Sequence, residues 1–117
     1  MLKRTRFVAL GFVAFLAVSK DASAECVQKA TIENSTSGTR DFSLACGTGA
    51  PSNFSLEPNE SHDYTCKWSR ACGDDTGIYI SFVSSPRVRV QRRELYNGMS
   101  YHFGMIGNDI ALFMAVF

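Results

Sequence analysis

The segment from Pro86 to Arg93 has the most distinctive side-chain pattern in the chain, because basic residues alternate with apolar ones. On a half-buried strand its two valines would point inward, and one outward row would contain Arg87, Arg89 and Arg93. Guanidinium groups bind sulfate, phosphate or carboxylate through paired hydrogen bonds. The pattern therefore predicts either a site for an anionic ligand, such as an acidic polysaccharide or a lipid headgroup, or a charged edge strand that keeps the domain soluble.

Trp68 is the second candidate contact residue, since Trp and Tyr side chains are common anchors at binding interfaces. It lies between Cys66 and Cys72, where a short disulfide loop would hold its ring at the surface. A protein or a glycan is the partner that such an aromatic loop would suit. Packing of the indole in the core is the alternative interpretation.

The residues that could catalyse a reaction are few. The two histidines are His62 and His102, and the sequence contains no nucleophile elbow, zinc-protease motif or phosphate-binding loop. Asp74 and Asp75 share a Gly-rich turn, but Ca²⁺ takes about six to eight oxygen ligands and few lie nearby. We therefore expect no enzyme, no metal and no cofactor, with a small hydrolase based on one histidine as a minor alternative.

The segments that would position these residues have the period-two alternation of strands rather than helical spacing. Turn-forming residues separate them at short intervals, including Asn97-Gly98 and Gly107-Asn108, the dipeptides preferred by two-residue hairpins. An all-β fold follows: a small antiparallel β-sandwich or barrel of seven to eight short strands. The last segment is apolar on both faces and is expected to be a buried central strand, with a hydrophobic docking surface as the alternative. The segments are 27–34, 40–46, 53–57, 61–68, 77–84, 87–93, 100–106 and 110–117.

The four cysteines predict two disulfides. If residues 27–34 and 39–46 form a hairpin, Cys26 lies opposite Cys46 at its open end, at a separation that a disulfide accepts. Cys66 would then pair with Cys72. This is the preferred pairing, although four cysteines allow two other connectivities.

Residues 1–24 have the three zones of a cleavable signal peptide. Three basic residues precede a 12-residue apolar run from Phe7 to Val18, and Ala22-Ser23-Ala24 supplies the small residues before the cleavage point. A membrane-spanning helix needs about 20 apolar residues, so no stable membrane insertion is expected after cleavage. Residues 25–117 would then form a single disulfide-stapled β domain that is secreted or periplasmic.

Removal of the signal peptide reverses the sign of the net charge. It takes away four of the 12 basic side chains and one of the 11 acidic ones, which changes the net charge from +1 to −2. A domain that binds nucleic acid is usually basic, so a nucleic-acid partner is not expected. The sequence predicts a small exported module that binds a protein or glycan through the loop around Trp68. Its alternative is a binder of anionic ligands through Arg87, Arg89 and Arg93.

Overall fold

The computed structural model describes residues 24–115 and contains strands but no helix. The predicted signal peptide, apart from Ala24, lies outside the described residues. Among those described there is no helix with the length and apolar character needed to cross a membrane. Every expected strand is present, with bounds within two residues of the prediction except at the C-terminal end. The strands are β1 (Cys26–Asn34), β2 (Arg40–Cys46), β3 (Ser52–Leu56), β4 (Ser61–Trp68), β5 (Ile78–Ser85), β6 (Val88–Leu95), β7 (Met99–Ile106) and β8 (Asp109–Met114).

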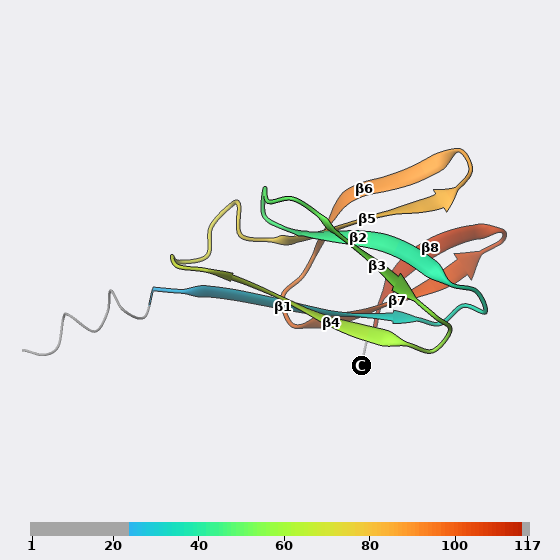
Figure 1. The fold of residues 1–117 in the computed structure, drawn as a ribbon, viewed down its shortest axis with the longest axis horizontal. Coiled ribbons are helices and arrows are strands. Elements are labelled where there is room, and N and C mark those ends of the chain that lie inside the picture. The colour runs from blue at the N-terminus through green and yellow to red at the C-terminus, as the bar shows by residue number, and fades with distance from the viewer. Residues whose placement is uncertain (1–23, 116–117) are drawn as a thin grey trace, which may run out of the picture.

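The strands form two four-stranded sheets that pack face to face as a sandwich (Figure 1). The first sheet has the order β4-β1-β7-β8 and the second the order β3-β2-β5-β6. Neighbours pair antiparallel, as expected, except that β1 runs parallel to β7. The β5–β6 and β7–β8 hairpins extend together at one end of the sandwich (Figure 1). Two separate sheets exclude the closed barrel that the strand pattern also allowed.

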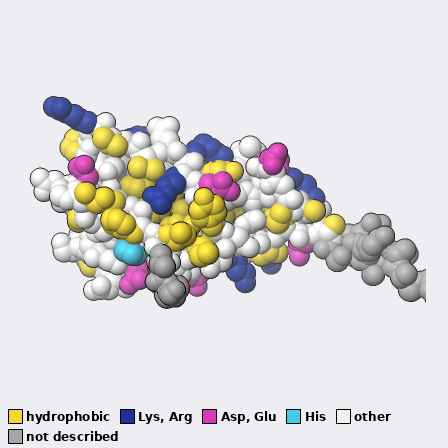
Figure 2. Space-filling model, turned by 180° about the vertical axis from the view of Figure 1, so that it is seen from behind, with side chains coloured by type: hydrophobic (Ala, Val, Ile, Leu, Met, Phe, Trp, Pro, Cys, Tyr) yellow, Lys and Arg dark blue, Asp and Glu magenta, His cyan; other side chains and the backbone are white. Residues whose placement is uncertain are grey.

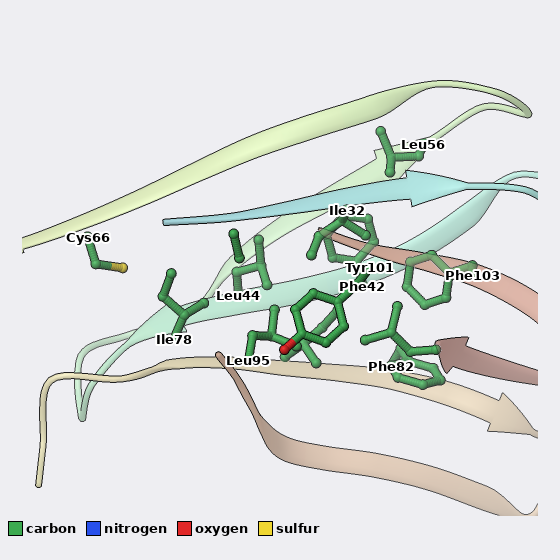
Figure 3. Packing of buried hydrophobic residues seen from close by; sticks show 13 residues of the cluster. Ile32, Phe42, Leu44, Leu56, Cys66, Ile78, Phe82, Leu95, Tyr101 and Phe103 are labelled. Carbon is green, nitrogen blue, oxygen red and sulfur yellow. The ribbon is translucent and has the colours of Figure 1, made fainter. Parts of the chain in front are cut away.

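One side of each strand contributes to a single apolar core between the sheets (Figure 3). The Phe103 ring on β7 is fully buried and contacts rings from the opposite sheet, with centroids 5.4 Å from Phe42 and 5.2 Å from Phe82. Burial of side chains this large is the main favourable term in the folding of such a domain. Because the inner face of each strand is occupied by the core, only the outer face is available to contact a ligand.

The predicted hairpin between residues 27–34 and 39–46 does not form, because β1 and β2 belong to different sheets. Their connection is held by Asn34, whose fully buried amide donates to the carbonyl oxygens of Gly38 and Leu56. The Asn34 Oδ1 accepts hydrogen bonds from the backbone N–H and hydroxyl of Thr36. These four bonds turn the chain from one sheet to the other.

The preferred disulfide pairing was wrong for the same reason. The bonds are Cys26–Cys72 and Cys46–Cys66, with Cα separations of 4.8 and 5.7 Å. Cys46–Cys66 joins β2 to β4 across the two sheets, and Cys26–Cys72 ties the loop after β4 to the start of β1. Two disulfides indicate an oxidising compartment.

Two expectations about the C-terminal third also need correction. Asn97-Gly98 does not close a hairpin but lies in the crossing from β6 to β7, where Gly98 has a φ of 79° and its N–H donates to Lys29 O. Strand β8 is not buried on both faces: it is the edge strand of the first sheet, and Phe113 and Met114 are exposed. Gly107-Asn108 forms the predicted two-residue turn between β7 and β8.

Candidate functional site

The predicted outward row of Arg87, Arg89 and Arg93 is interrupted by a β-bulge in β6. Strand β6 pairs with β5 as Ile80↔Arg93 and then as Phe82↔Val90, so the alternation shifts by one residue between these pairs. Arg93 consequently lies on the face of the buried Ile80, and its guanidinium donates to the Leu112 carbonyl oxygen at 2.8 Å. Arg87 lies in the turn before β6. The prediction of one row was therefore wrong, and only Arg89 takes its expected place on the outer face.

Arg92 occupies the outward position that Arg93 was expected to hold. Its φ of 49° is unusual for a residue with a side chain, and bulges often redirect a side chain beside a functional site. Arg92 Nη2 donates to Gly47 O at 2.9 Å, and its guanidinium carbon lies 4.3 Å from the centre of the Tyr79 ring. This contact holds the cation against the sheet. The sequence signal was Gln91-Arg92-Arg93, where the alternation of polar and apolar residues stops.

The outer face of the second sheet contains a groove that sequence reasoning missed. Its larger part has a volume of about 430 Å³, and its smaller part, about 230 Å³, shares Ser43 and Ser81 with it. The larger part is wide open to solvent, so a ligand there would lie across the sheet rather than be enclosed. We call this open depression the face groove. Its polar lining residues are Asp41, Ser43, Asn53, Ser55, Ser81, Arg89 and Arg92.

The side chains of the face groove are neutral on one wall and cationic on the other. Asn53 and Ser55 lie on edge strand β3, whereas Arg89 and Arg92 lie on the opposite edge strand, β6. Asp41 on β2 accepts a hydrogen bond from the Ser55 hydroxyl. Two strand spacings, about 10 Å between backbones, separate β2 from β6, and within residues 24–115 Asp41 forms no ion pair with either arginine. The groove therefore presents hydroxyl, amide and carboxylate groups facing two guanidinium groups.

Trp68 does not occupy an exposed disulfide loop, because Cys66 and Cys72 are not bonded to each other. It ends β4, shares the inner face of that strand with the buried Cys66, and packs against the core while half-buried. Its Cζ2 atom would lie 3.6 Å from a Cβ added at Gly47. Its position agrees better with the alternative interpretation, in which the indole packs in the core, than with a role as an exposed contact residue.

The two histidines lie on opposite faces of the first sheet. The His62 ring faces inward, with its centroid 4.5 Å from that of Phe54, and the His102 ring stacks on Phe113 on the outer face. Neither lines the face groove. Within residues 24–115 no three His, Cys, Asp or Glu side chains are grouped to hold a metal ion. Neither histidine is therefore placed beside the serines that line the face groove.

Apolar side chains are also exposed outside the face groove. Figure 2, which shows the molecule from behind, has hydrophobic side chains grouped in the middle of that face with basic and acidic side chains among them. They come from strand edges and hairpin ends rather than from one continuous cavity. Of the large apolar side chains exposed by more than a third, Val83 lines the face groove and the others lie outside it: Val88, Tyr96, Met99, Met105, Ile106, Phe113 and Met114.

Comparison with known proteins adds no site residues. The chain matches no family model and no curated protein. The candidate site therefore rests on the geometry of the face groove.

Proposed function

We propose that this protein is an exported, non-enzymatic binding module that holds a glycan in the face groove. The observation that carries the proposal is the groove itself, about 430 Å³ in its larger part and lined by Ser43, Asn53, Ser55 and Asp41. Hydroxyl, amide and carboxylate side chains are the groups that exchange hydrogen bonds with sugar hydroxyls. The small size of the serines leaves the floor open to a ring-shaped ligand.

A glycan suits this face better than an extended peptide does. Peptides commonly add to a sheet through backbone hydrogen bonds at a free edge. The floor of the face groove is formed by β2 and β5, which are paired on both sides, so their backbone groups are already bonded within the sheet. Only side chains remain to bind a ligand there, and a sugar can meet them with its own hydroxyl groups.

The compartment of this activity is the periplasm or the extracellular space. Two disulfides support it, because such bonds persist in oxidising compartments. The signal-peptide pattern of residues 1–24 supports it independently. At a net charge of −2 after cleavage, the domain lacks the basic character expected of a nucleic-acid-binding protein.

The proposal is tested by filling the groove. Ser43 lines both of its parts, so the Ser43→Tyr substitution places a ring where the ligand would lie. Binding is measured by calorimetry against a panel of neutral and acidic oligosaccharides. We expect Ser43→Tyr to abolish the binding that the unchanged protein shows. The matched control is Thr65→Tyr, which adds the same ring to an exposed position on β4 in the other sheet.

The outcomes separate the face groove from other surfaces. Retained binding in Thr65→Tyr together with its loss in Ser43→Tyr supports the proposal, provided that both variants have the circular dichroism spectrum of the unchanged protein. Equal binding by all three proteins would place the glycan elsewhere. Absence of binding to every oligosaccharide at millimolar concentration would reject the glycan and leave a protein as the partner to be sought.

A further inference from the structure

The two arginines of the face groove form no ion pair within the domain. The one ion pair among residues 24–115 is Arg70–Asp75, so neither Arg89 nor Arg92 has a carboxylate oxygen within 4 Å there. Arg92 uses one N–H on Gly47 O and lies over the Tyr79 ring. A guanidinium has five N–H donors, so most of those on Arg92 are left for a ligand.

We propose that the glycan bound in the face groove is acidic and that Arg89 and Arg92 bind its oxyanions. This inference rests on the proposed function and names the class of ligand. The shared chemistry is that of a carboxylate or sulfate group, which a guanidinium binds through two parallel hydrogen bonds. The neutral wall formed by Asn53 and Ser55 holds the sugar hydroxyls, and the β6 wall holds the charge.

The bulge in β6 brings Arg92 to the groove beside Arg89. With unbroken alternation the side chain of Arg92 would point inward and that of Arg93 outward. The register shift between Ile80 and Phe82 turns Arg92 outward, and the Ser81 hydroxyl accepts its backbone N–H at 3.0 Å. Arg89 lines the larger part of the groove and Arg92 the smaller part. A ligand lying across Ser43 and Ser81 would therefore reach one cation from each part.

Asp41 gives the ligand a preferred orientation. Its carboxylate lies on the β2 side of the groove, about 10 Å from β6 by strand spacing, and it accepts from the Ser55 hydroxyl. An anionic substituent placed beside it would be repelled, whereas the same substituent at β6 is attracted. The acidic groups of the glycan are therefore expected to line up along β6 and its neutral hydroxyls along β2 and β3.

The test compares acidic and neutral oligosaccharides of similar length on charge variants. The probes are an oligogalacturonate for carboxylates, a heparin oligosaccharide for sulfates and a neutral malto-oligosaccharide. Arg89→Gln and Arg92→Gln each remove one cation, and Lys67→Gln removes one from an exposed position on the first sheet. We expect each arginine variant to bind the preferred acidic probe about tenfold more weakly, the loss of one charged hydrogen-bonding group. Lys67→Gln should bind as the unchanged protein does.

Salt dependence and a conservative variant sharpen the test. Affinity for the acidic probe should fall as NaCl is raised, because exposed charges are screened within about 8 Å at physiological ionic strength. Arg92→Lys retains the charge but loses the planar fork, so its affinity should lie between those of the unchanged protein and Arg92→Gln. Thermal unfolding of each variant shows that the fold is retained at the temperature of the measurement.

The possible results distinguish this inference from the proposed function. Equal binding of neutral and acidic probes, unaffected by the arginine variants but lost in Ser43→Tyr, would overturn the inference and keep the glycan groove. Binding that persists in Ser43→Tyr would overturn both. Binding of polyglutamate with none of the oligosaccharides would replace the glycan with an acidic peptide. The relative affinities for the carboxylate and sulfate probes identify which oxyanion the groove prefers.

Discussion

Arg93 on β6 donates a hydrogen bond from Nη1 to the carbonyl oxygen of Leu112 on β8, 2.8 Å away. A second hydrogen bond also connects the two sheets: the Ser84 hydroxyl on β5 donates to the Ile110 carbonyl oxygen at 2.7 Å. Both acceptors belong to the edge strand of the first sheet and both donors to the second sheet. The two bonds therefore connect the sheets at their open edge and cover carbonyls that another chain could otherwise pair with.

The Arg93→Ala variant should be less stable and more prone to associate. Loss of a hydrogen bond from a charged group predicts a decrease of about 2 kcal/mol in the free energy of unfolding, measured in urea. Light scattering should show larger particles, because a Leu112 carbonyl is freed at the β8 edge. Arg87→Ala, in the exposed turn before β6, is the matched control. Identical stability of the two variants would contradict a structural role for Arg93.

Trp68→Ala should weaken the fold rather than ligand binding. The indole is half-buried against the core, so its removal is expected to lower the free energy of unfolding by about 3 kcal/mol. Tyr96 is 61% exposed, and Tyr96→Ala should have an effect of less than about 0.5 kcal/mol. Glycan affinity, measured where both variants are folded, should stay unchanged. A stable Trp68→Ala protein with lost affinity would restore Trp68 as the contact residue.

Two glycines with positive φ should respond differently to the same substitution. A Cβ on Gly98 (φ 79°) would meet nothing within 4 Å, so Gly98→Ala carries only the backbone strain, about 1 kcal/mol. A Cβ on Gly47 (φ 58°) would overlap the Asp75 carbonyl oxygen. Gly47→Ala should therefore cost at least about 3 kcal/mol in the free energy of unfolding. Chemical denaturation of the two variants side by side checks this order, and equal losses would contradict it.

The disulfide connectivity can be read from a tryptic digest without reduction. No Lys or Arg lies between Arg40 and Lys67, so Cys46 and Cys66 fall in one peptide, residues 41–67. Mass spectrometry should find this peptide bonded only to itself, and the peptide that contains Cys26 bonded to residues 71–87. The other two connectivities would attach residues 41–67 to both of those peptides.

The two disulfides should contribute comparable stability. In the chain-entropy model, a separation of 20 residues for Cys46–Cys66 gives about 3 kcal/mol. The separation of 46 residues for Cys26–Cys72 gives about 4 kcal/mol. Paired Cys→Ser variants measured by denaturation in urea test these values. A negligible loss in either variant would show that the unfolded chain is constrained by other means.

The Arg70–Asp75 pair predicts a local pH dependence. Arg70 Nη1 donates to Asp75 Oδ1 at 2.8 Å, and this bond lowers the pKa of the Asp75 carboxyl below its ordinary value. Any stability it contributes is present at neutral pH and is lost as the pH falls through the lowered pKa. In Arg70→Gln the Asp75 carboxyl should titrate at higher pH by NMR. Because both side chains are about half exposed, Tm should change little. An unchanged titration would show that the pair does not persist in solution.

The strands could be predicted from the sequence because alternation is a local property. The alternation in segment 61–68 places His62 and Trp68 on the same face of the strand, and both face inward. Alternation does not say which strand lies beside which. Residues 27–34 and 40–46 are consecutive strands with a short turn between them, yet the bonds made by Asn34 send them into different sheets. The predicted Cys26–Cys46 disulfide assumed that these two strands pair with each other, and it was wrong because they do not.

Of the candidate site, the sequence revealed only the basic strand that forms one wall. Anion binding by residues 87–93 remains a prediction, and a single bulge exchanged the orientations expected of Arg92 and Arg93. The serines of the face groove come from three strands of ordinary composition, so no local pattern marked them. Their significance depends on the register that sets Ser43 beside both Asn53 and Ser81.

The position of β1 has a consequence for biogenesis. Its neighbours are β4 and, in parallel register, β7, so residues near position 30 meet residues near position 100. Contacts this distant along the chain slow folding, since a long loop must close before they form. In a chain synthesised from its N-terminal end, β1 can pair with β4 first, but its other edge stays open until β7 has been made. A chaperone that shields this open strand edge would therefore raise the yield of folded protein.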